Sequence, residues 1–182
     1  TAFDAGEGKP PFVAEFDIGV AQVEGAESAA RALERAAQLA ADLEGAATLY
    51  TKRFGIVLDR NTVQELSDEY AATRESKQRW SVATLEPAGA FVDWMFDRVV
   101  AAAKPGDTIT FNAGGQGSGK TTATRVLPSH KRVVLIMDGT MQNLARSREH
   151  LRRCFDAELR VEIRFIYCPW RKAITNMVKR AI

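Results

Sequence analysis

The spacing of hydrophobic positions changes along the chain near residue 105. Before that point, apolar side chains recur every three or four residues, as on one face of an amphipathic helix. Beyond it, short apolar runs alternate with polar stretches long enough for a helix, which is the rhythm of a parallel sheet with helical connections. Three strands are predicted there: Thr108–Asn112, Val133–Met137 and Val161–Cys168. The sequence therefore predicts a helical region followed by an α/β core.

Three local signals divide the helical region. The alanine-rich residues 28–43 predict a first helix, and Gly45 marks its expected end. Thr62 and Glu65 have the spacing of a capping box, which predicts the start of a second helix. Pro87 suits the first turn of a third helix.

The predicted sheet has few strands for a core of this kind. Ahead of the helices, apolar residues alternate over Phe12–Val20, which predicts an edge strand within a leader formed by residues 1–26. We expect this segment or a partner chain to extend the sheet, unless the C-terminal part of the core is incomplete.

A glycine-rich stretch separates the first core strand from the helix that follows it. It matches the phosphate-binding pattern G-x-x-x-x-G-K-[ST] with Gly114-Gly115-Gln116-Gly117-Ser118-Gly119-Lys120-Thr121. The glycines allow the backbone to turn its N–H groups inward around phosphate oxygens, and the helix directs its positive end at the same anion. The motif and its place in the chain together predict a P-loop that binds ATP with Mg²⁺.

Three side chains of the loop have predicted roles. Lys120 would reach the β- and γ-phosphates, and Thr121 would place its hydroxyl on Mg²⁺, which prefers hard oxygen ligands. Thr122 would add a phosphate contact. The competing interpretation is a glycine-rich turn that binds nothing.

Asp138 directly follows the apolar run of the second core strand, so we expect it at the carboxyl edge of the sheet beside the P-loop, where parallel sheets bind ligands. Two roles are open for its carboxylate: coordination of Mg²⁺ through water, or acceptance of a proton from a substrate hydroxyl. In a third interpretation, Asp138 only caps the helix that follows Gly139.

The end of the chain is rich in basic residues. Residues 120–182 hold 14 basic and 5 acidic side chains, whereas residues 1–119 hold 11 basic and 18 acidic ones. This half suits a nucleotide, a sugar phosphate or a nucleic-acid backbone, although a solvated basic face would give the same count. Arg171 and Arg180 are the preferred catalytic cations, because they follow the third core strand, where P-loop kinases carry a mobile lid.

Composition limits the class of protein. The chain has 182 residues, of which 46% are hydrophobic and 26% charged, as expected of a globular domain. No apolar run approaches the roughly 20 residues of a membrane span, so we expect no membrane partner and a cytoplasmic location, native or in a target cell. Cys154 and Cys168 are predicted to be buried hydrophobes. His130 and His150 lack partners at ligand spacing, which argues against a zinc site.

The order of these motifs resembles the zeta toxin family of P-loop small-molecule kinases. The resemblance covers residues 105–182 and rests on Gly117–Thr122, on Asp138-Gly139-Thr140 with Arg146, and on Phe165–Pro169 before a basic helix. Residues 50–104 are similar to the helical lead-in of such proteins, more weakly. Typical members carry an extra strand after the P-loop helix, which ends in an aspartate-rich motif with the catalytic base. Only 17 residues separate Lys120 from Asp138 here, so the chain resembles a compact variant in which Asp138 serves both functions.

The resemblance implies a three-layer α/β/α core of the P-loop NTPase/kinase type with parallel strands over residues 105–182, preceded by a helical region over residues 27–104. It also implies transfer of the ATP γ-phosphate to a hydroxyl of a small molecule, such as UDP-N-acetylglucosamine, and control by an antitoxin or inhibitor protein. Two alternatives stay open. The basic half favours a polynucleotide kinase or nucleic-acid-linked P-loop ATPase, and the helical region would suit a non-catalytic nucleotide-binding module that binds a partner protein.

Overall fold

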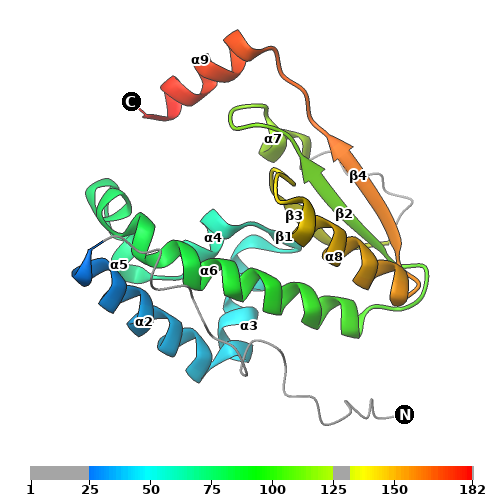
Figure 1. Ribbon diagram of the computed structural model, residues 1–182, viewed down its shortest axis with the longest axis horizontal. Coiled ribbons are helices and arrows are strands. Elements are labelled where there is room, and N and C mark those ends of the chain that lie inside the picture. Colours follow the sequence, from blue (N-terminus) through cyan, green and yellow to red (C-terminus); the bar gives the residue numbers. More distant parts are fainter. Residues whose placement is uncertain (1–24, 125–131, 182) are drawn as a thin grey trace. The chain divides into compact units, whose positions relative to one another are not determined.

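The computed structural model describes residues 25–124 and 132–181, which divide into two compact units (Figure 1). The first, here called the helical unit, comprises the chain up to Gly55 together with Arg60–Asp97. The second, the sheet unit, comprises Ile56–Asp59 and the chain from Arg98 onward. The predicted edge strand at Phe12–Val20 lies outside the described residues.

The helical unit is built from helices around an aromatic and alanine-rich core. Its elements are α2 (Ala26–Ala41), α3 (Leu43–Phe54), α4 (Arg60–Gln64), α5 (Asp68–Ala71) and most of α6 (Arg74–Ala102). Tyr50 and Phe91 are almost fully buried, and their ring centroids lie 6.3 Å apart. Phe91 continues the cluster to Trp94 at 5.7 Å. Burial of such rings is the main stabilising term of the unit.

The first helix, α2, ends at Ala41, and the prediction that Gly45 marks its end is therefore wrong. Asp42 leaves the helical conformation after α2 and starts α3, because its carboxylate accepts a hydrogen bond of 2.8 Å from the Gly45 N–H. A Cβ at residue 45 would lie only 2.0 Å from this carboxylate. Gly45 therefore leaves room for a cap at the start of the next helix.

The predicted capping box at Thr62 is also wrong. Thr62 lies inside α4, and its hydroxyl is 2.6 Å from the hydroxyl of the buried Tyr50. A tertiary hydrogen bond thus replaces the local one that the spacing suggested.

Pro87 does not begin the third helix but lies inside α6, which starts thirteen residues earlier at Arg74. Thr73 caps this start, since its hydroxyl accepts a hydrogen bond of 3.0 Å from the Ser76 N–H. A proline inside a helix costs about 3 kcal/mol, because one backbone hydrogen bond is lost. Apolar side chains on both sides of Pro87 are buried, Ala83 and Phe91 completely, and this burial holds the helix together across the proline.

The sheet unit is a mixed α/β structure with four parallel strands in the order β1-β3-β2-β4. Its strands are β1 (Val57–Leu58), β2 (Thr108–Ala113), β3 (Val133–Asp138) and β4 (Arg160–Phe165). Its helices are α7 (Lys120–Thr124), α8 (Leu144–Asp156) and α9 (Trp170–Ala181). The predicted α/β class with parallel strands is confirmed at this level.

The three predicted core strands are confirmed as β2, β3 and β4, although β4 ends at Phe165 rather than Cys168. The fourth strand, β1, was not predicted. It comes from the region assigned to helices and pairs with β3, with Leu58 opposite Met137. The sheet is thus extended from within the chain, by a strand ahead of the glycine-rich loop in sequence.

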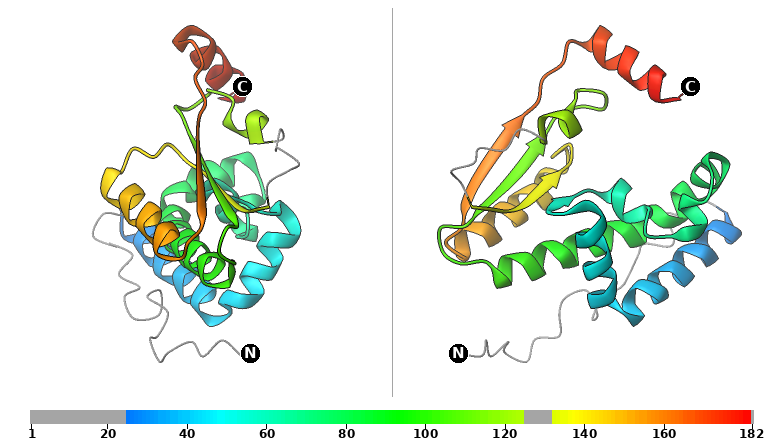
Figure 2. Two further views of the ribbon diagram at one scale, coloured as in Figure 1. Left: turned by 90° about the vertical axis from the view of Figure 1, so that its right-hand side faces the viewer. Right: turned by 180° about the vertical axis from the view of Figure 1, so that it is seen from behind.

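The connections place helices on both faces of the sheet. The chain leaves β2 through α7 to β3 on one side, and then crosses back through α8 to β4 on the other. Figure 2 shows the sheet edge-on, with α7 and α8 on opposite faces. Right-handed crossovers in opposite directions require this arrangement. All six residues of β2 are buried, as expected of a central strand covered on both faces.

Two further expectations concern buried and membrane-spanning residues. Cys154 is fully buried as predicted, and burial raises the pKa of its thiol to about 11. Cys168, which was also predicted to be buried, is partly exposed.

None of the helices that the structure describes is long and apolar enough to cross a bilayer.

Candidate functional site

The glycine-rich loop joins β2 to α7 at the carboxyl edge of the sheet. Three of its glycines, Gly114, Gly117 and Gly119, have positive φ angles of 146°, 72° and 94°. Residues that have a side chain rarely adopt such backbone angles. The path of the loop backbone therefore requires glycine at these positions. The predicted place of the motif, between a strand and a helix, is confirmed.

Lys120 and the backbone close the loop on itself. The Lys120 ammonium donates hydrogen bonds to the carbonyl oxygens of Gly114 and Gly115, at 2.9 and 3.1 Å. The N–H groups of Thr122 and Ala123 both donate to the Gly119 carbonyl at 3.0 Å. The ammonium is therefore held at the first residues of the loop.

The segment after β4 packs against this loop. A Cβ at Gly114 would lie 2.5 Å from the carbonyl oxygen of Ile166, and one at Gly117 would lie 2.4 Å from that of Ala173. The side-chain amide of Asn176 donates a hydrogen bond of 2.8 Å to the Gly117 carbonyl. The loop and the start of the chain's last helix thus form one packed structure.

Asp138 is the last residue of β3, opposite Asn112 of β2. Its Oδ1 atom is buried and accepts no hydrogen bond from the described part of the chain. Burial raises the pKa of this carboxyl, the nearby negative charge of Asp59 raises it further, and the positive charge of Lys120 lowers it. A partly buried carboxyl group that two neighbouring charges influence is typical of a functional site.

The interpretation of Asp138 as a helix cap does not agree with the structure. The helix after it, α8, begins at Leu144, and its cap is Asn143, whose side chain accepts a hydrogen bond of 3.0 Å from the Arg146 N–H. Asp138 is therefore available for the two chemical roles that the sequence left open.

Asp59 is the site residue that sequence reasoning missed. It directly follows β1, and β1 pairs in parallel with β3, so Asp59 and Asp138 end neighbouring strands at the same edge of the sheet. The negative charge of Asp59 raises the pKa of Asp138, as expected of two carboxylates at the ends of neighbouring strands. The available signal was Ile56-Val57-Leu58 between a glycine and an aspartate, a short copy of the run that ends at Asp138.

The raised pKa of Asp138 gives a prediction for stability. Between its ordinary value of 3.8 and the raised value, the folded protein binds this proton more tightly than the unfolded chain does, so stability falls as the pH rises through that range. Asp138→Asn removes the buried charge. We expect this variant to melt about 1–4 °C higher than the wild type at pH 8, and the gain to shrink as the pH is lowered toward 4.

Thermal unfolding followed by circular dichroism at several pH values measures this effect. The matched control is Asp156→Asn, which removes an exposed carboxylate from α8 in the same unit. Equal melting temperatures for Asp138→Asn and wild type at pH 8 would show that the Asp138 charge does not destabilise the folded protein.

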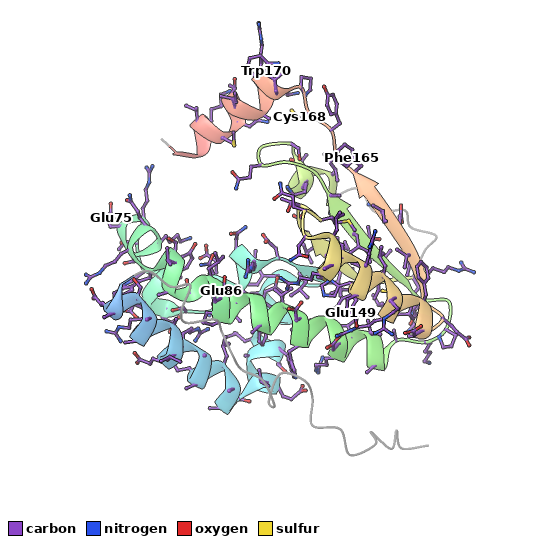
Figure 3. All side chains as sticks on the ribbon, in the orientation of Figure 1. Glu75, Glu86, Glu149, Phe165, Cys168 and Trp170 are labelled. Atoms are coloured by element: carbon purple, nitrogen blue, oxygen red, sulfur yellow. The ribbon has the colours of Figure 1, made fainter. Side chains whose placement is uncertain are left out.

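Within the described residues, the structure does not place the other predicted site residues against Lys120 or Asp138. Arg171 is exposed, and its guanidinium lies 5.3 Å from the centroid of the Trp170 ring. Phe165, Cys168 and Trp170 lie on the segment that leads from β4 into α9 (Figure 3). Thr122 is exposed at the start of α7. Thr121 and Arg180 lie in α7 and α9, and their side chains are outside the described part of the structure.

Mg²⁺ is the metal ion that the sequence predicts at this edge of the sheet. Residues 25–124 and 132–181 contain no group of three or more His, Cys, Asp or Glu that could hold a metal ion. Magnesium needs fewer protein ligands, because it keeps several waters and binds substrate phosphates. The buried oxygen of Asp138, beside a second carboxylate and the phosphate-binding pattern, fits such a site.

Comparisons with known proteins add no assignment to this geometry. No protein-family model matches the chain, and no curated protein matches it.

Proposed function

We propose that the protein is a P-loop kinase that transfers the γ-phosphate of ATP to a hydroxyl group of a small molecule, as in the zeta toxin family that it resembles. The observation that carries the proposal is the meeting of three features at one sheet edge: the glycine-rich loop with Lys120, Asp138 at the end of β3, and Asp59 at the end of β1. A loop alone would support nucleotide binding. The two carboxylates beside it supply what phosphoryl transfer needs in addition.

Phosphate binding rests on the loop. Backbone N–H groups of residues 115–120 would surround the phosphate oxygens, and Lys120 would exchange its two loop carbonyls for the β- and γ-phosphates. Positive φ angles at Gly117 and Gly119 support this proposal, because nests of inward-pointing N–H groups need such angles.

The two aspartates have different positions relative to the loop. β3 lies next to β2, the strand that leads into the loop, whereas β1 lies one strand further away. Asp138 is therefore assigned to the metal, together with the Thr121 hydroxyl and phosphate oxygens. Mg²⁺ bound there would neutralise charge on the β- and γ-phosphates. Asp59 is assigned to the acceptor, which approaches the γ-phosphate from its outer side.

In the proposed reaction, the oxygen of the acceptor hydroxyl forms a bond to the γ-phosphorus. The bond between this phosphorus and the bridging oxygen breaks, and ADP leaves with that oxygen. The hydroxyl proton passes to the Asp59 carboxylate. Arg171 and Arg180 of α9 stay the proposed cations for the charge that develops on the transferred group.

Asp59 offers a candidate for the base that typical members of the family carry on a later strand. Typical members carry the base-bearing strand after the P-loop helix, and the sequence here has no room for it. β1 supplies a strand that ends in an aspartate beside β3, but from a position ahead of the loop in the chain. Asp138 then no longer needs to serve both functions.

The proposed function is tested by a product assay. The protein is incubated with Mg-ATP and a panel of nucleotide sugars that includes UDP-N-acetylglucosamine, and products are analysed by mass spectrometry. A gain of about 80 Da on one acceptor identifies phosphorylation. The gain should be absent with Lys120→Ala. If the wild type modifies no acceptor while it still binds ATP, the non-catalytic nucleotide-binding module is favoured instead.

A nucleic-acid acceptor is the second candidate, favoured by the basic side chains of α9. Arg171, Lys172 and Lys179 are exposed on this helix, and its described residues include no acidic side chain. Oligonucleotides with free 5′-hydroxyls in the same product assay test this candidate. Phosphorylation of an oligonucleotide would support it, and a decline of that phosphorylation at higher salt would indicate binding through the phosphate backbone.

A further inference from the structure

We propose that Asn176 is a positioning residue that couples the docking of α9 to the shape of the phosphate-binding loop, so that nucleotide binding and α9 docking favour each other. The inference rests on the proposed nucleotide site and adds to it a means of regulation. It is carried by contacts between the loop and a helix more than fifty residues further along the chain.

The first observation is steric. The backbone of α9 approaches Gly117 so closely that a Cβ there would lie 2.4 Å from the Ala173 carbonyl oxygen and 3.1 Å from the Met177 side chain. The phosphate-binding pattern leaves position 117 open to any residue, since only its first and sixth positions require glycine. The glycine at 117 is therefore explained by the close approach of α9 together with its φ angle of 72°.

The second observation is a directed hydrogen bond. The Asn176 side-chain amide donates to the carbonyl oxygen of Gly117 at 2.8 Å, from a partly buried position. This bond fixes the orientation of the peptide that joins Gly117 to Ser118, whose N–H donates to the Gly115 carbonyl at 3.3 Å, and so holds the loop in one conformation. A loop that binds phosphate through its N–H groups depends on such orientations, so Asn176 acts on the ligand through the loop.

Coupling follows from these two contacts. If α9 docks, the loop is held in one conformation, and a ligand that needs this conformation no longer has to order the loop itself. By reciprocity, a bound nucleotide favours the docked helix. Because α9 also carries Arg171 and Lys172, nucleotide binding would bring these basic residues toward the loop together with the helix.

The test compares wild type, Asn176→Ala and the matched control Thr175→Ala. Thr175 is the preceding residue of α9, exposed, with its hydroxyl bonded to the Arg171 carbonyl within the helix. Isothermal titration measures the Kd of Mg-ADP, and hydrogen exchange with mass spectrometry follows residues 113–120 and 166–181 with and without Mg-ADP.

We expect Asn176→Ala to weaken Mg-ADP binding by about 3–10-fold, as for the loss of one neutral hydrogen bond, and to increase exchange in residues 113–120. Mg-ADP should protect residues 166–181 in the wild type and much less in the variant. Thr175→Ala should behave as the wild type. Asn176→Leu, which keeps the approximate size and removes the donor without adding a charge, should reproduce the alanine result if the alanine variant folds poorly.

Wild-type affinity in both Asn176 variants would overturn the inference. If the wild type itself binds no nucleotide, the proposed function fails, and the exchange experiment without nucleotide still decides the coupling. Faster exchange of residues 113–120 in Asn176→Ala alone then supports the link between helix and loop, and unchanged exchange overturns it.

Discussion

Lys120→Ala is expected to lower the rate of phosphoryl transfer by about 10²–10³-fold, the usual loss when one charged or donor group that stabilises the transition state is removed. The Lys120 ammonium lies at the loop, donating to the carbonyls of Gly114 and Gly115, and would move onto the phosphates. Rates at saturating Mg-ATP, measured by ADP release with the acceptor found in the product assay, test this expectation.

A charge-matched control separates this effect from a general loss of positive charge. Lys104→Ala removes an exposed lysine of the sheet unit, just ahead of β2, and should leave the rate unchanged. Circular dichroism should show that both variants are folded, with the helical content of the wild type. Equal activity of Lys120→Ala and Lys104→Ala would refute the assignment of the loop as the ATP site.

The strands around the loop could be predicted because their signals are local. Val133–Asp138 is an uninterrupted apolar run that ends in an acid, and β2 lies between the turn at Pro105 and a glycine-rich motif. Buried parallel strands produce such runs without help from distant residues. The positions of the loop, Lys120 and Asp138 at the carboxyl edge of the sheet were therefore predicted correctly.

The helical unit was predicted less well, because its helix ends depend on contacts between distant residues. The local sequence around Pro87 predicts the start of a helix. In the structure, buried side chains on both sides of Pro87 keep α6 continuous through it. Thr62 has the spacing of a cap, yet its hydroxyl contacts Tyr50. Local signals give the helix type, while packing decides where each helix begins.

Asp59 escaped prediction for a topological reason. A strand of two residues, Val57–Leu58, carries too short an apolar pattern to be separated from the helices around it. What defines it is its pairing with β3, more than seventy residues further along the chain. Order along the sequence therefore gives a poor guide to the order of strands at the site.

Asp59→Asn is expected to reduce the rate of phosphoryl transfer by about 10²–10⁴-fold, the range found for loss of a general base, while the affinity for Mg-ADP stays within about threefold of the wild type. The asparagine keeps the shape of the side chain and accepts no proton from the acceptor. In the wild type, the rate should rise with pH as the general base loses its proton.

Comparison of the two aspartates decides between their roles. Asp138→Asn should raise the concentration of Mg²⁺ needed for half-maximal activity, whereas Asp59→Asn should leave that concentration unchanged and lose the rise with pH. Asp156→Asn, on α8, serves as the control for removal of a negative charge and should alter neither property. If the two effects are exchanged, the base is Asp138 and the metal ligand is Asp59. If neither variant loses activity, the carboxylate pair takes no part in the reaction, and the strand that supplies Asp59 serves only to extend the sheet.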